Sequence, residues 1–121
     1  MNAFDPRILA AVAIGGAAGS VARYAAGVLV PRLLPSDLPL GTLFVNILGG
    51  FLIGLLAELL TADVSPLWRP FLITGVLGGF TTFSAFSLEA VSLGRPLGML
   101  YVALSVLGAL AACWAGQAVA R

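Results

Sequence analysis

Long apolar runs alternate with short segments rich in proline, glycine and polar residues along this chain of 121 residues. Each run is close to the ~20 residues that an α-helix needs to cross the hydrocarbon of a bilayer. The runs cover residues 8–30, 41–60, 71–93 and 97–119. The separators, such as Pro31 to Pro39 and Gly94 to Pro96, contain strong helix breakers and are too short for an independent domain. The pattern predicts an all-α membrane protein in which residues 1–121 form one domain of four transmembrane helices.

The third run differs from the others because polar and helix-interrupting residues occupy its centre. From Gly75 to Ser87 the chain reads GVLGGFTTFSAFS, between apolar flanks. Backbone that leaves a helix at membrane depth must be satisfied by protein or by a water-filled path. Discontinuous helices of this kind hold ions in membrane transport proteins. We therefore predict that the third helix is broken in mid-membrane and that this segment serves the passage of an ion or solute.

Composition supports a membrane protein and argues against several other classes. Hydrophobic residues make up 60% of the chain and charged residues 9%, with a mean hydropathy of +1.09, whereas a soluble domain carries about 25% charged residues. Histidine is absent and Cys113 is the single cysteine, so a transition-metal site is not expected. The chain contains no nucleotide-binding motif and no catalytic triad. We expect neither an enzyme nor a nucleic-acid-binding protein.

Two features bear on assembly. Small residues recur at helix-packing spacing in every run, which allows close approach of helices in lipid; the sets are Gly15 and Gly19, Gly50 and Gly54, Gly75 and Gly79, and Gly108 with Ala112 and Gly116. Packing within one chain explains any one pair equally well, but their presence in all four runs favours a tightly packed oligomer.

The arginines provide the second feature, because cytoplasmic loops normally carry the excess of positive charge. Three lie toward one side of a four-span protein and three toward the other: Arg7, Arg69 and Arg121 against Arg23, Arg32 and Arg95. Either other factors set a fixed topology, or the chain inserts in both orientations. The second interpretation predicts an antiparallel dimer, in which two identical chains form an inverted repeat.

Polar residues inside the runs are candidates for an ion path, since they are costly in hydrocarbon. Thr42 and Asn46 share one helix face, where the Asn46 amide can donate to an anion or bond a neighbouring helix. Arg23 can extend to the interface or make an entrance attractive to anions. Tyr101 and Ser105 lie one turn apart in the fourth run.

The aromatic stripe of the third run, which includes Phe83 and Phe86, has two interpretations. Such stripes usually pack in a core, but ring edges carry positive potential and can face a small anion. The carbonyl groups of Gly78 and Thr81 suit a hard cation such as sodium. Glu89, one turn beyond Phe86, is an interfacial residue, a hydrogen-bonding residue or a gate. These residues indicate an ion site without identifying the ion.

In these residues the chain resembles the Fluc (CrcB) family of fluoride channels. The resemblance covers nearly the whole chain, through Gly15-Gly16, Gly19-Ser20, Arg23-Tyr24, the stretch GTLFVN from Gly41 to Asn46, and GGFTTFSAFS from Gly78 to Ser87 with Glu89. It implies a dual-topology, antiparallel homodimer in the cell membrane, with two fluoride pores and a structural sodium ion at the dimer centre. By this resemblance the fluoride pathway comprises Asn46, Phe83, Phe86, Thr42, Ser84, Tyr101, Ser105, Arg23 and Glu89, and carbonyl groups of Gly78 and Thr81 bind the sodium.

The resemblance implies passive export of cytoplasmic fluoride. Ala85 stands where the family often has threonine, so one hydroxyl of the polar path is missing. Two alternatives are a small multidrug-type cation/proton antiporter and a non-transporting membrane scaffold. The antiporter needs an acid in the first span, yet no Asp or Glu lies between Arg7 and Asp37. The scaffold would leave Asn46 and the interrupted third run unexplained.

Overall fold

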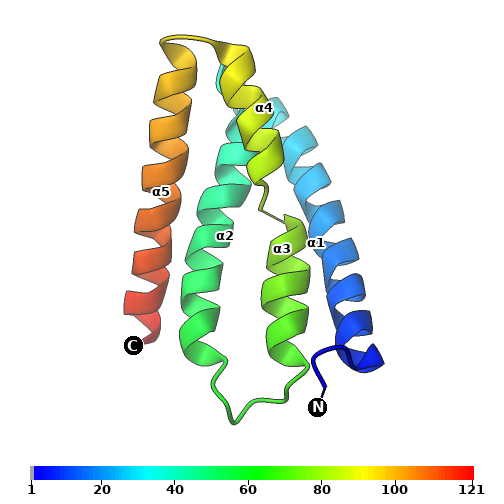
Figure 1. Ribbon diagram of the computed structural model, residues 1–121. Helices are drawn as coiled ribbons and strands as arrows, with labels where there is room; N and C mark the ends of the chain where they lie inside the picture. Colours follow the sequence, from blue (N-terminus) through cyan, green and yellow to red (C-terminus); the bar gives the residue numbers. More distant parts are fainter. Residues whose placement is uncertain (1) are drawn as a thin grey trace.

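The computed structural model describes residues 2–121 (Figure 1). Its elements are α1 (Pro6–Leu33), α2 (Leu40–Leu59), the π-helical segment η1 (Pro70–Leu77), α3 (Gly78–Phe80), α4 (Phe83–Leu93) and α5 (Leu97–Ala120). η1, α3 and α4 together make up one candidate membrane span, Pro70–Leu93. With α1, α2 and α5, four segments are therefore long and apolar enough to cross a membrane. The prediction of an all-helical membrane protein with four spans is confirmed.

The helices associate in two pairs (Figure 1). α1 packs along η1 and α3, and α2 packs along α5. Beyond α3 the chain changes course, and α4 contacts α5. Both termini lie at the same end of the bundle as the loop between α2 and η1. The residues between α3 and α4 therefore lie where the two helix pairs meet.

Glycine makes the close approach within each pair possible. A Cβ atom at Gly15 would lie 2.5 Å from the carbonyl oxygen of Phe71, and one at Gly50 would lie 2.8 Å from that of Ala109. Comparable backbone contacts surround Gly19, Gly54, Gly75, Gly79 and Gly116. These glycines are thus used for packing within one chain, and their spacing does not require an oligomer to explain it.

The helix ends differ in part from the sequence prediction. α1 continues past Pro31 to Leu33, where the Leu34 amide donates to the Val30 carbonyl at 2.8 Å. A proline removes the hydrogen bond to the residue four positions before it, but near a helix end this loss does not stop the last turn.

At the N-terminal end of α1, the Asp5 side chain caps the helix by accepting from the Arg7 amide at 2.8 Å. Hydrogen bonds from Arg7 lower the pKa of the Asp5 carboxyl.

The loop between α4 and α5 depends on one glycine. Gly94 has a φ of 68°, a left-handed conformation that residues with a Cβ rarely adopt. This tight turn places α5 beside α4 at once. The buried residues of the bundle are few and include Val45, Leu77, Phe86, Tyr101 and Ser105. Large apolar side chains on α1, α2, α4 and α5 are exposed. Such an outer surface suits lipid or another membrane chain.

Candidate functional site

Helical structure is interrupted at Thr81 and Thr82. Thr81 has φ −115° and ψ 126°, and Thr82 has φ −132° and ψ 125°, so both are extended. Helical geometry resumes at Phe83, with Thr82 as the N-cap of α4. The Thr82 side-chain oxygen accepts from the Ala85 amide at 3.1 Å, which satisfies one of the amide groups that a helix start leaves without a partner.

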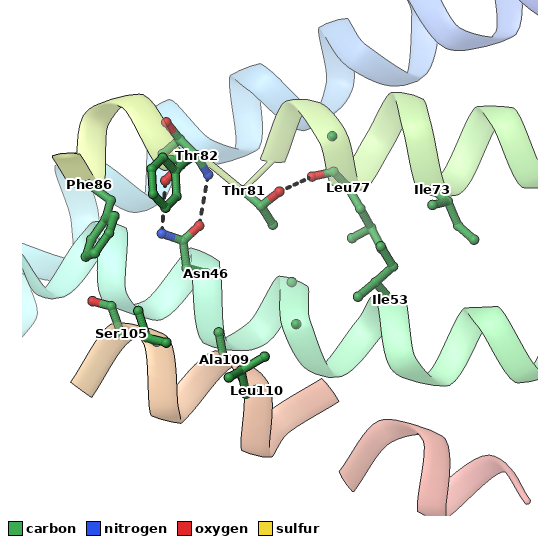
Figure 2. Close-up of a pocket in the computed structure, with 15 residues that line it drawn as sticks. Asn46, Ile53, Ile73, Leu77, Thr81, Thr82, Phe86, Ser105, Ala109 and Leu110 are labelled. Carbon is green, nitrogen blue, oxygen red and sulfur yellow. Dashed lines mark hydrogen bonds between the residues drawn. The ribbon is translucent and has the colours of Figure 1, made fainter. Parts of the chain in front are cut away.

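Asn46 on α2 binds the backbone of Thr82 in both directions (Figure 2). Its Oδ1 accepts from the Thr82 amide at 2.8 Å, and its Nδ2 donates to the Thr82 carbonyl at 3.1 Å. One side chain thereby satisfies both polar backbone groups of an extended residue. Of the two interpretations of Asn46, bonding between helical segments is present, and the second N–H of the amide remains for another acceptor.

The interruption also frees carbonyl groups that a continuous helix would satisfy. The Gly79 carbonyl accepts from Nε of Arg23 at 3.2 Å. The Leu77 carbonyl, by contrast, keeps its helical bond from the Thr81 amide at 3.2 Å and also accepts from the Thr81 hydroxyl at 2.9 Å. Within residues 2–121, no hydrogen bond reaches the carbonyl oxygens of Gly78 or Thr81 from outside the regular helices. These two oxygens are chemically suited to a hard cation.

The aromatic residues after the interruption occupy contrasting environments. Phe86 is 7% exposed, whereas Phe83 is 76% exposed. Their ring centroids lie 5.4 Å apart at an interplanar angle of 59°, and the same centroid distance separates Phe86 from Tyr101 on α5. Phe86 thus belongs to the core of this chain, while Phe83 presents its ring outward beside polar backbone.

A cavity of about 560 Å³ opens beside the interruption (Figure 2). Polar side chains of Asn46, Thr81, Thr82 and Ser105 line it together with Phe83, Phe86 and aliphatic residues of η1, α2 and α5. Figure 2 shows Ser105 on the same side of the cavity as Phe86. A path that combines hydroxyl and amide groups with aromatic rings can replace part of the water around a small ion.

A second cavity, of about 300 Å³, lies between α1, α2 and α4. Arg23 lines it together with Thr42 and Glu89. The Thr42 hydroxyl donates to Oε1 of Glu89 at 2.8 Å, so the acid is held by a neighbouring helix. This cavity therefore holds one guanidinium and one tethered carboxylate.

Two buried hydroxyl groups belong to α5. Tyr101 is fully buried and Ser105 is 5% exposed, and neither hydroxyl has a hydrogen-bond partner within residues 2–121. Unpaired hydroxyl groups are costly in a protein interior. They are available to a ligand or to water.

The structure gathers most of the predicted site residues around these two cavities. Ser84 is exposed, and its hydroxyl lies 3.3 Å from that of Thr82. The residue that the sequence analysis did not single out is Thr82, which joins Asn46 to α4. A threonine directly before a renewed apolar run is a recognised N-cap signal and could have identified it.

Comparisons with known proteins agree with this architecture. Residues 10–117 match the family described as "CrcB-like protein, Camphor Resistance (CrcB)". A protein of Agrobacterium fabrum named fluoride-specific ion channel FluC is 52% identical over 119 residues, covering 93% of this chain and 95% of that protein. Proteins with the same name from Rhizobium johnstonii and Cereibacter sphaeroides are 53% and 50% identical, and cover 91% of this chain and 93% and 91% of their own lengths. The relatives are named as ion channels and not as enzymes.

Proposed function

The chain belongs to the CrcB family, and from this membership we propose that it is a fluoride-selective channel that exports cytoplasmic fluoride passively. The relatives of about 50% identity are fluoride channels by name. The observation that carries the proposal is the polar interruption at Thr81 and Thr82, which lies beside a cavity lined by an amide, hydroxyl groups and phenyl rings.

The proposed pathway begins in the cavity lined by Arg23, whose charge attracts anions. It continues past Asn46 to the rings of Phe83 and Phe86, with Thr42, Ser84, Tyr101, Ser105 and Glu89 along its wall. A small anion that loses water here gains hydrogen bonds from amide and hydroxyl groups and contact with the positive edges of the rings. We propose that the path narrows here to a constriction too tight for a larger anion of the same charge, which provides selectivity against chloride.

We further propose that two chains assemble as an antiparallel dimer with the third helix of each broken at mid-membrane. The exposed ring of Phe83 supports this, because a phenyl group beside polar backbone is better placed against a partner chain than in lipid. The even division of the arginines also supports insertion in both orientations. Each dimer would contain two pores related by the two-fold axis.

Sodium is proposed as a structural ion on that axis. The carbonyl oxygens of Gly78 and Thr81 fit this role because they are oxygen ligands left unpaired by the interruption. Two chains supply two such oxygens each. The bound cation would hold the interrupted segments together and offset the cost of the freed carbonyl groups.

The driving force for export is electrical. A negative membrane potential favours the outward movement of an anion by ~2.3 kcal/mol per 100 mV for each charge. No fuel or catalytic group is needed. The protein then has only to lower the cost of removing water from the ion, which the groups around Asn46 do.

Fluoride efflux from liposomes tests the proposal. Purified protein is reconstituted with internal potassium fluoride, valinomycin releases the potassium, and an electrode records external fluoride. Rapid fluoride efflux with much slower, but measurable, chloride efflux from vesicles loaded with potassium chloride is expected. A well-dispersed, reconstituted protein that releases no fluoride would refute the proposed function, and proton-coupled uptake of a cationic drug in the same vesicles would support the antiporter instead.

A further inference from the structure

Thr82 lies between the two cavities. Among residues 2–121 it is the one residue that lines both the 560 Å³ cavity beside Phe86 and the 300 Å³ cavity beside Arg23. An ion that moves from one cavity to the other therefore passes this residue.

The contacts of Thr82 divide into two kinds. Its backbone amide and carbonyl are held by Asn46, at 2.8 and 3.1 Å. Its hydroxyl accepts from the Ala85 amide at 3.1 Å and lies 3.3 Å from the hydroxyl of Ser84. The backbone contacts attach the residue to α2, and the hydroxyl contacts attach it to the first turn of α4.

This arrangement connects Asn46 on α2 to the start of α4 through Thr82. Phe83 is the first residue of α4 and Phe86 the fourth, so both lie within a turn of the cap. A side-chain cap determines how the chain enters a helix and satisfies an amide of its first turn. Without it, the Ala85 amide loses its acceptor, and the first turn can fray and reorient Phe83.

We propose that Thr82 is a positioning residue for ion selectivity, which acts through its hydroxyl by fixing the first turn of α4 and hence the rings of Phe83 and Phe86. The inference rests on the proposed channel function. Asn46 has a corresponding second role, because it orients Thr82 in addition to any contact with the ion. The selectivity of the path then depends on a residue whose side chain caps a helix.

The test compares three variants in the liposome assay, with both fluoride and chloride efflux measured for each. Thr82→Val keeps the shape of the side chain and its backbone contacts but removes the cap. Thr82→Ser keeps the cap. Ser92→Ala is the matched control, because it removes a hydroxyl from the same helix, where Ser92 donates to the Leu88 carbonyl at 2.7 Å on the exposed side.

The wild-type protein, Thr82→Ser and Ser92→Ala are expected to share one ratio of fluoride to chloride efflux. Thr82→Val should lower this ratio by about fivefold, the factor that corresponds to the typical loss of an N-cap. The ratio is measured on conducting protein, so a smaller folded fraction does not change it. If Thr82→Val does not yield folded protein, Thr82→Ala replaces it, since alanine also lacks the capping hydroxyl and is disfavoured at an N-cap.

Two results would overturn the inference. In the first, wild-type protein conducts fluoride and the variant without the cap keeps the same ratio. In the second, Thr82→Ser loses selectivity as completely as Thr82→Val, which would assign the effect to side-chain shape. A wild-type protein that does not conduct fluoride is a different result, because it rejects the proposed channel function itself.

Discussion

Replacing Gly19 by alanine should separate α1 from the segment that leads to the interruption. A Cβ atom at Gly19 would lie 2.6 Å from the Phe80 amide nitrogen and 2.9 Å from the Val76 carbonyl carbon, and closer still to the Val76 carbonyl oxygen. All three are backbone atoms, so no side-chain rotation relieves the overlap. Ordinary contact begins near 3.4 Å, and the helices must therefore move apart by about 1 Å.

The expected magnitude follows from a comparison with Gly27→Ala on the same helix. A Cβ atom at Gly27 meets nothing within 4 Å, so that variant gains the ~1 kcal/mol by which alanine exceeds glycine in a helix. Gly19→Ala gains the same amount but overpacks the interface, at a cost of ~1–3 kcal/mol. The free energies of unfolding of the two variants should therefore differ by ~1–3 kcal/mol, with Gly19→Ala the less stable.

Thermal unfolding of each variant in the same detergent measures this difference. In a small soluble domain ~1 kcal/mol shifts Tm by roughly 4–8 °C, so we expect Gly19→Ala to melt at least several degrees below Gly27→Ala. Movement of Phe80 would also reach the adjacent Thr81, and fluoride efflux through Gly19→Ala should fall. Equal melting temperatures for the two variants would show that the close packing of α1 on η1 and α3 is not a determinant of stability.

Three further predictions concern the site and the end of α1. Asn46→Leu leaves both polar backbone groups of Thr82 without partners, at ~1–3 kcal/mol for each, and should reduce fluoride efflux at least tenfold, whereas unchanged efflux would contradict the role of the amide. Replacing sodium by N-methylglucamine throughout preparation should lower efflux reversibly, and full activity without sodium would reject the structural ion. The Asp5 carboxyl has a lowered pKa because of Arg7, so its stabilising effect is present above its unfolded pKa and is lost as the pH falls through the folded pKa. Asp5→Asn should show a smaller loss of stability on acidification below about pH 4, as measured by melting temperature.

The number and order of the spans could be predicted from the sequence because they depend on local properties. A run of about 20 apolar residues is long enough for the bilayer, and the prolines and glycines between the runs stop helices whatever surrounds them. The turn at Gly94 is likewise local, as is the interruption at Thr81, which follows from glycines and hydroxyl residues in an apolar run. Pro31 marks the limit of such reasoning, since the helix continues through it to Leu33.

The sequence could also identify residues for the site without identifying their partners. Asn46 was recognisable as an amide within a span, and Arg23 as a charge within a span. Neither the bonds of Asn46 to Thr82 nor that of Arg23 to the Gly79 carbonyl was predicted. Each of these hydrogen bonds depends on which helices are neighbours and on how the helices are aligned along their axes.

The sequence by itself determined that this is a four-span membrane protein with an interrupted third run and polar residues around it. Tertiary structure decided that the glycines pack α1 on η1 and α2 on α5 within one chain, and that Thr82 lines both cavities. The physical reason is the range of the interactions. Hydropathy and helix breaking act within a few residues, whereas hydrogen bonds and close packing join residues far apart in the chain only after the helices have come together.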